Sequence, residues 1–248
     1  MSHPPSFESL PLLGQAHLQT LLGAFVKPWK DPPSIERRVV LPDGDRLSLL
    51  VSTPVAWTDQ DPTAVLVHGL TGSDQSAYMV RLAHKYYNRG VRAVRLNLRG
   101  AGTGVGIARK PYNGGCSDDV WCAIEELHAE TPRSAFTLAG FSLGGNIVLK
   151  LAGEKGDDAR RLLRQVIAFC PPVDLHAASR KVSRRRNVLL ERFFVGQLKR
   201  DADLKAQQFP DLEHPETPRT WSLFEFDDGY TAPIWGYENA DAYYQHAS

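Results

Sequence analysis

Cysteine is scarce in this sequence, neither sign of charge predominates, and no apolar run is long. The 248 residues carry a formal net charge of +1. A charge this close to zero excludes a general electrostatic attraction to nucleic acid or to an anionic membrane, so we expect no nucleic-acid partner. The three cysteines (Cys116, Cys122 and Cys170) are odd in number and lack metal-ligand spacing. They favour a reduced, cytoplasmic setting and give no reason to expect a metal site.

The most apolar stretch near the N-terminus covers residues 10–26, and Gln15, His17 and Gln19 interrupt it. It is too short and too polar to span a bilayer. No basic segment precedes it and no small-residue cleavage site is obvious, so we predict no signal peptide. We expect residues 1–35 to form an N-terminal arm that packs on the domain.

The sequence also lacks internal repeats and low-complexity tracts, and 42% of its residues are hydrophobic, enough for a sizeable core. Residues 37–52 predict a hairpin with its turn at 42–45. Short apolar runs predict further strands, and periodic segments between them predict helices. The strands are expected at 64–69, 91–100, 135–140 and 165–172, and the helices at 76–90, 117–128 and 144–154. This alternation predicts an α/β core over residues 36–173 with a mostly parallel sheet and helices on both faces.

Residues 174–248 differ from the core, because they are rich in charge and aromatics and contain no convincing buried strand. We expect a helical, cap-like segment with an amphipathic helix over 186–200. The apolar side of 188–198 is compatible with an acyl-chain pocket or with plain packing on the core. The basic stretch 180–186 is compatible with an acidic partner or a membrane surface, but a solvated helix face is its commoner use.

The motif G-x-S-x-G places Ser142 between Gly140 and Gly144. An apolar strand is predicted before it and a helix after it, which is the context in which this motif presents a nucleophile. The glycines permit a tight turn that lifts the hydroxyl off the sheet edge, and the helix N-terminus favours developing negative charge. We therefore predict that Ser142 is a nucleophile. The alternative is a chance match in a glycine-rich segment.

The stretch VHGLTG (67–72) ends an earlier predicted strand, where folds with this motif supply an oxyanion donor. We predict the backbone N–H groups of Leu70 and Leu143 as the two donors, each worth about 3 kcal/mol in transition-state stabilisation. His68 is an alternative as catalytic base, although a histidine before this glycine more often shapes the loop. The glycine-rich loop 99–106 matches neither nucleotide-binding pattern, so we expect a flexible connection and no cofactor.

Residues 64–172 resemble the α/β-hydrolase fold through VHGLTG, NLRGAG and GFSLGGN. Three further stretches are similar to the YheT-like branch of that fold, which includes plant EMB8 proteins and animal ABHD-type hydrolases. They are HLQTLLG (17–23), LPDGDRLSLLVS (41–52) and FEFDDGYTAPIWGYENADAYY (224–244). The resemblance covers nearly the whole chain.

This resemblance implies hydrolysis of fatty-acyl or short-chain esters by a Ser–Asp–His triad, without a cofactor. It matches Ser142 to the nucleophile, and Leu70 and Leu143 to the oxyanion donors. Family members continue with two more strands that carry the aspartate and the histidine. The resemblance therefore implies that the last two strands and these two residues are missing here, and that residues 165–170 become a sheet edge unless residues 174–248 cover it.

The residues downstream of Ser142 do not replace the two implied partners. His176, His214 and His246 lack the family context, and Asp227 and Asp228 belong to the cap-like motif. The main hypothesis is a serine hydrolase acting on small-molecule esters. Acyl transfer to an alcohol would use the same residues. The alternative is a non-catalytic hydrolase-fold protein that binds a hydrophobic ligand or a partner. The sequence leaves the oligomeric state open.

Overall fold

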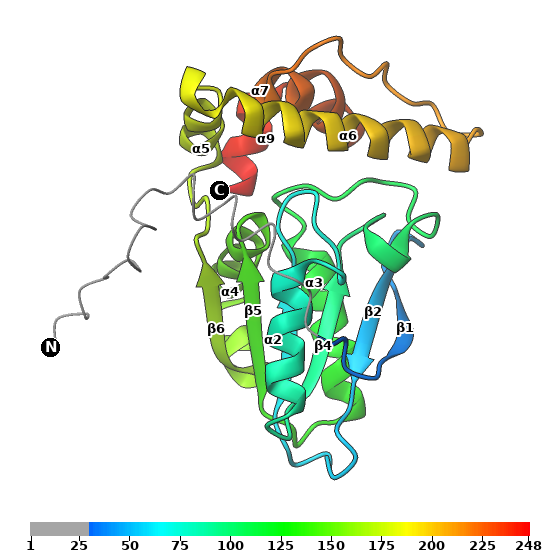
Figure 1. The fold of residues 1–248 in the computed structure, drawn as a ribbon, viewed down its shortest axis with the longest axis vertical. Helices are drawn as coiled ribbons and strands as arrows, with labels where there is room; N and C mark the ends of the chain where they lie inside the picture. Colours follow the sequence, from blue (N-terminus) through cyan, green and yellow to red (C-terminus); the bar gives the residue numbers. More distant parts are fainter. Residues whose placement is uncertain (1–29) are drawn as a thin grey trace, which may run out of the picture.

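The computed structural model describes residues 30–248. Most of the predicted N-terminal arm (1–35) and the family-like stretch 17–23 lie outside the described residues. The described chain forms an α/β unit with a layer of helices stacked over one end of its sheet (Figure 1).

The sheet has six strands in the order β1-β2-β4-β3-β5-β6. Strands β1 and β2 form the predicted antiparallel hairpin, β2 runs antiparallel to β4, and the remaining pairs are parallel. This mixed, mostly parallel sheet confirms the predicted fold class. Their bounds are β1 Ile35–Val40, β2 Arg46–Ser52, β3 Thr63–Val67, β4 Arg92–Asn97, β5 Phe136–Phe141 and β6 Leu163–Phe169.

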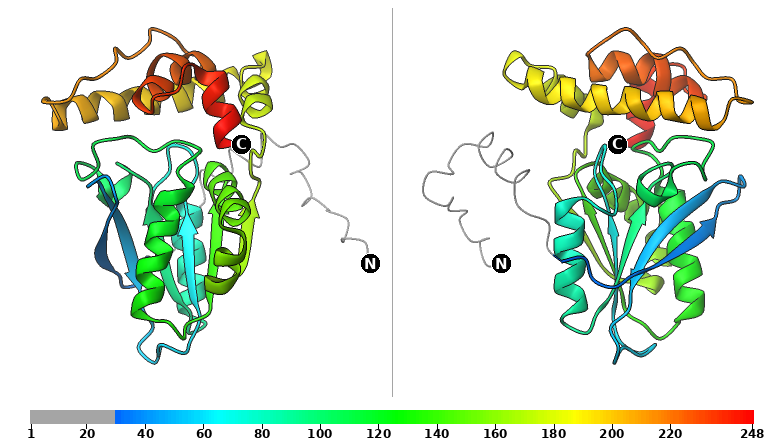
Figure 2. Two further views of the ribbon diagram at one scale, coloured as in Figure 1. Left: turned by 180° about the vertical axis from the view of Figure 1, so that it is seen from behind. Right: turned by 45° about the vertical axis from the view of Figure 1, so that its right-hand side comes forward.

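Helices cover both faces of the sheet (Figure 2). Helix α2 (Ala77–Tyr87) packs on the face that carries Leu66 of β3, whereas Val65 and Val67 face α3 and α4. Because strand residues alternate between faces, a strand buried on both sides has to be apolar throughout. This explains the continuous apolar run of β3. On the second face lie α3 (Ser117–Glu130) and α4 (Leu143–Leu162).

Two details of the core differ from the sequence expectation. Helix α4 was expected to end at residue 154, but it continues to Leu162 across an interruption at Gly156, where φ is +49°. The two arginines that made β4 look less apolar are buried. The guanidinium of Arg95 donates to the carbonyl oxygen of Asp74 at 3.0 Å and pairs with Asp31 at 2.6 Å, so its charge is balanced inside the fold.

Residues 174–248, hereafter the cap segment, form helices joined by loops and lie over the carboxyl ends of the parallel strands (Figure 1). The long helix α6 crosses this end, and it extends to Gln208 rather than stopping near residue 200. Within the described part of the chain, β6 pairs with β5 and has no second neighbour. The cap elements are α5 Leu175–Val182, α6 Val188–Gln208, α7 Leu223–Phe226, a π-helical turn Asp227–Thr231, α8 Ala232–Ile234 and α9 Ala240–Ala247.

Candidate active site

Ser142 is the single residue between the end of β5 and the start of α4. Its backbone has φ 50° and ψ −119°, a conformation that non-glycine residues rarely adopt and that costs energy. The N–H of Ser142 donates to the carbonyl oxygen of Phe169 at 2.9 Å, which continues the pairing of β5 with β6 into the turn. The turn therefore holds the serine at the carboxyl edge of the sheet, directly before a helix N-terminus.

The glycines on either side of Ser142 are required by close backbone contacts. A Cβ added at Gly140 would overlap the carbonyl oxygen of Gly144. A Cβ added at Gly144 would overlap the carbonyl oxygen of His68, at the end of β3. The spacing of the motif thus follows from two backbone approaches that leave no room for a side chain.

The loop after β3 lies against the serine. A Cβ on Gly69 would be 3.0 Å from the Cβ of Ser142. The N–H groups of Gly69 and Thr71 donate to tyrosine hydroxyls, at 3.0 and 2.7 Å. Neither the N–H of Leu70 nor that of Leu143 has an acceptor among residues 30–248. The structure thus brings the three predicted site residues together, with two unused donors beside the serine.

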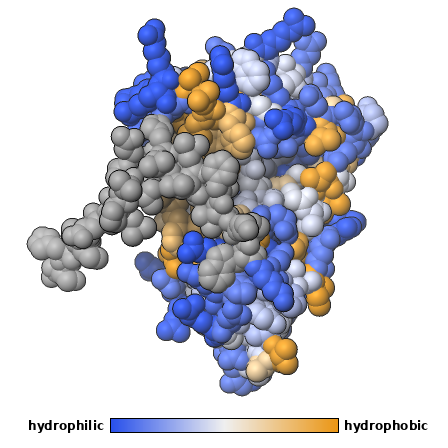
Figure 3. Space-filling view, in the orientation of Figure 1, coloured by the Kyte–Doolittle hydropathy of each residue, from blue (hydrophilic) through white to orange (hydrophobic). Residues whose placement is uncertain are grey.

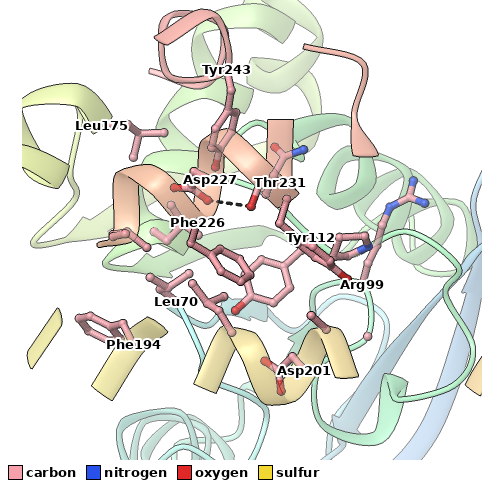
Figure 4. Close-up of a pocket in the computed structure, with 18 of the residues that line it drawn as sticks. Leu70, Arg99, Tyr112, Leu175, Phe194, Asp201, Phe226, Asp227, Thr231 and Tyr243 are labelled. Carbon is pink, nitrogen blue, oxygen red and sulfur yellow. Dashed lines mark hydrogen bonds between the residues drawn. The ribbon is translucent and has the colours of Figure 1, made fainter. Parts of the chain in front are cut away.

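A cavity separates this turn from the cap segment. Its empty space, including the part open to solvent, is about 1300 Å³, and Ser142, Leu70 and Leu143 belong to its floor. Figure 4 shows side chains from the core loops and from the cap helices converging on it. Most of the cap side of the wall is apolar, including Leu175, Val182, Phe194, Leu198 and Phe226. The arrangement offers an apolar chamber next to a strained serine.

Residues 58–212, more than half of the chain, match the family described as serine aminopeptidase, S33. The chain belongs to this family of α/β-hydrolases. The resemblance stated from the sequence motifs is therefore confirmed.

Relatives of this S33-family chain include both bacterial and animal proteins. It is 28% identical to YheT of Escherichia coli (strain K12), covering 98% of this chain and 72% of that protein. It is 26% identical to phospholipase ABHD3 of Mus musculus, covering 93% of this chain and 57% of that protein. The chain thus spans only part of the length of these relatives.

The fold has a counterpart among solved structures. The α/β-hydrolase GrgF from Penicillium sp. sh18 aligns with a TM-score of 0.50 at 17% identity, over 75% of this chain and 60% of that one. At this identity the likeness supports the fold alone.

His68 of this S33-family chain is unsuited to act as a base. Its Nε2 accepts the N–H of Leu98 at 3.1 Å, and its Nδ1 donates to the carbonyl oxygen of Gly69 at 2.8 Å. Because a backbone N–H only donates and a carbonyl only accepts, these two bonds set the tautomer and occupy the lone pair. Burial lowers the pKa of His68 to about 4. His68 therefore holds the loop that carries Leu70.

The three histidines that follow Ser142 in the chain have other partners. His176 pairs with Asp241 at 3.1 Å, His214 bonds the carbonyl oxygen of Phe209, and the ring of His246 packs on Tyr237. No histidine among residues 30–248 lines the cavity.

Asp227 is the site residue whose position sequence reasoning missed. The sequence assigned it to the cap-like motif, but the structure also places its buried carboxylate in the cavity wall (Figure 4). The carboxylate accepts hydrogen bonds from the hydroxyls of Thr231 and Tyr244, both at 2.7 Å. Burial raises the pKa of Asp227 to about 6, and the two hydrogen bonds oppose this shift. One oxygen thus holds the π-helical turn together, and the other joins this turn to α9.

The glycine-rich loop is better fixed than expected. A Cβ on Gly102 would overlap the carboxylate of Asp74, and Arg99 at the start of the loop pairs with Asp45 at 2.7 Å and Asp119 at 2.6 Å. The expectation of a flexible connection is therefore wrong, because a buried charge network and close packing hold this loop.

Residues 30–248 contain no cluster of three or more potential metal ligands. Over the same residues, no helix combines the length and apolarity needed to cross a bilayer.

Proposed function

We propose that this chain carries the nucleophile and the oxyanion hole of a carboxylic ester hydrolase. In this proposal Ser142 Oγ attacks the ester carbonyl, and the N–H groups of Leu70 and Leu143 bind the oxygen that becomes negative. The observation that carries the proposal is the strained Ser142 turn with two unused N–H donors beside it. Preorganised donors of this kind stabilise a tetrahedral intermediate more than the ground state, by about 3 kcal/mol each.

The cavity supports an ester with an apolar acyl group. Its cap side is formed largely by aliphatic and aromatic side chains, and burial of a hydrocarbon chain against such walls is favourable. The mouse relative is named as a phospholipase, which is consistent with a fatty-acyl ester. We therefore favour fatty-acyl esters as the substrate class. The three cysteines are free, in keeping with the cytoplasmic setting that we expect.

The proton acceptor for Ser142 is proposed to lie outside these 248 residues, together with the aspartate that orients it. Two observations support this. No described histidine lines the cavity, and the chain spans 72% and 57% of the two relatives above. Without the histidine that would accept the serine proton, serine acylation by this chain is expected to be slower by roughly 10⁶-fold than in a complete triad.

Chemical rescue tests the proposal. The chain is incubated with a small fluorophosphonate, with and without free imidazole, and the adduct is located by peptide mass spectrometry. We expect slow labelling at Ser142, acceleration by imidazole, and no adduct at this position in Ser142→Ala. Rapid labelling without imidazole would show that a histidine within the 248 residues already acts as the base. The variants His246→Ala and His214→Ala would then identify it.

A second candidate function is binding of a hydrophobic ligand without catalysis. It is favoured by the same absence of a described histidine beside an apolar cavity. This function predicts tight binding of a fluorescent fatty acid and no Ser142 adduct at any imidazole concentration. An imidazole-dependent adduct would exclude it.

A further inference from the structure

A basic surface covers the junction of α5 and α6. It contains six exposed cations between residues 180 and 192, and none of them pairs with an acid in the described part of the chain. We call it the α5–α6 surface. Its cations are Arg180, Lys181, Arg184, Arg185, Arg186 and Arg192. The local charge is therefore strongly positive, although the chain as a whole is nearly neutral.

The acidic residue within this stretch does not offset that charge at the surface. Glu191 is buried, and its carboxylate accepts hydrogen bonds from the Ser183 hydroxyl at 2.6 Å and from the Leu223 N–H at 3.0 Å. It is the only acid between residues 180 and 192. Since Glu191 is turned inward to join α5, α6 and α7, the exposed charges between residues 180 and 192 are all positive.

Large apolar side chains stand among these cations. Val188 is 42% exposed, Leu189 is 79% exposed and Phe193 is 57% exposed. Glu191 and Val195 form the buried line of the same helix. At about 100° per residue, Leu189 and Phe193 lie one turn apart on the side opposite that line. In Figure 3, hydrophobic residues are seen between strongly hydrophilic ones at the end of the molecule that carries α5 and the start of α6.

Exposed aliphatic and aromatic side chains beside several cations that pair with no acid of residues 30–248 are the chemistry of an interfacial helix. The apolar groups enter the boundary between headgroups and acyl chains, while each cation gains attraction from an anionic surface. Nucleic acid would use the cations but would leave the apolar side chains exposed to water. We propose that the α5–α6 surface docks the protein on anionic lipid membranes.

The position of this surface relates it to the cavity. Val182 of α5 and Phe194 and Leu198 of α6 line the cavity, so the same two helices present one side to the cavity and another to solvent. A bilayer docked on the outer side brings lipid esters close to the cavity wall. This last step, which names membrane lipids as the source of substrate, rests on the proposed function. Docking itself does not.

Vesicle co-sedimentation tests docking without any catalytic readout. One set of vesicles is phosphatidylcholine alone, and the other contains about one third phosphatidylserine, so that only the second has a strongly negative surface. We expect binding to the second set, weakening as salt is added because the attraction is screened. The double variant Arg185→Gln/Arg186→Gln should bind about 30-fold more weakly. The double variant Leu189→Ser/Phe193→Ser should bind at least about tenfold more weakly.

Matched controls separate docking from nonspecific charge and from catalysis. Arg160→Gln/Arg161→Gln removes the same charge from an exposed part of α4, and Val40→Ser/Val55→Ser removes exposed apolar groups from the core. Both should bind like the unmodified chain. Ser142→Ala should also bind normally, so failure of the proposed function would leave this result intact. Equal binding to both vesicle sets, no binding to either, or α5–α6 variants that match the controls would overturn the proposal. So would light scattering that shows a dimer of the unmodified chain and a monomer of the variant Leu189→Ser/Phe193→Ser.

Discussion

The core and the cap segment of this molecule hold their functional residues by different means. In the core, the position of Ser142 is set by backbone contacts that involve Gly140 and Gly144, with no space left for alternatives. In the cap segment, the cavity wall is held by side-chain interactions between separate helices, such as the hydrogen bond from Tyr244 to Asp227. The comparison teaches that the part expected to do the chemistry is built from the main chain, whereas the part that shapes the ligand chamber is built from replaceable side chains.

The largest expected effect is a loss of stability when a side chain is added to a glycine of the Ser142 turn. Gly140→Ala places a Cβ on the carbonyl oxygen of Gly144, so the turn has to open. We expect the free energy of unfolding to fall by about 3 kcal/mol or more, measured by urea denaturation. Gly153→Ala on α4 is the control, because a Cβ there meets nothing within 4 Å. It should leave stability unchanged or raise it by up to about 1 kcal/mol. Equal stability of the two variants would contradict the conclusion that backbone contacts fix the Ser142 turn.

A smaller effect is expected from the cap wall. Leu198→Ser removes an apolar side chain from the cavity, and we expect the affinity for a fluorescent long-chain fatty acid to fall about tenfold. Labelling of Ser142 by a small fluorophosphonate should change less than about twofold, because the turn is untouched. Leu189→Ser, on the outer face of the same helix, is the matched control and should bind the fatty acid normally. Loss of Ser142 labelling in Leu198→Ser would mean that the cap also shapes the turn.

The buried carboxylate of Asp227 in the cap segment is expected to make the stability of the folded chain depend on pH. Because the pKa of Asp227 is raised to about 6 in the folded chain, the folded state binds the proton more tightly than the unfolded state. Stability therefore rises as pH falls from 7 to 5, by about 1 kcal/mol from this residue. The lowered pKa of His68, about 4, acts in the opposite direction over the same pH range, so the contribution of Asp227 has to be read as a difference between variants. In unfolding titrations at the two pH values, Asp227→Asn should lack this gain of about 1 kcal/mol relative to the unmodified chain. Asp203→Asn, at an exposed position, should keep it.

The smallest effect is expected from relief of strain in the turn. Ser142→Gly places the residue that tolerates positive φ at the position where φ is 50°, so the free energy of unfolding should rise by about 1 kcal/mol. Ser142→Ala removes the same hydroxyl without relieving the backbone. It should therefore leave stability close to its original value. If thermal and urea unfolding give the same stability for both variants, the turn stores no strain.

Local patterns were sufficient to predict much of the core. The hairpin over residues 37–52, the alternating strands and helices, and the turn at Ser142 each depend on neighbours in sequence, and the structure has all of them. The sequence predictions were less accurate for features that depend on contacts between residues far apart in the chain. The ends of α4 and α6, the buried arginines of β4 and the tight packing of Gly102 depend on partners in other elements.

The sequence by itself determined that Ser142 stands in a strand–turn–helix segment, because the glycines and the flanking apolar run act within a few residues of it. Only the tertiary structure decided what surrounds this serine. The donors of Leu70 and Leu143 come from segments separated by two strands, and Asp227 reaches the cavity wall from the far end of the chain. No local pattern encodes which of these distant segments come together. The burial of Asp227, its hydrogen bonds and its raised pKa all depend on which segments exclude water from one another in the folded chain.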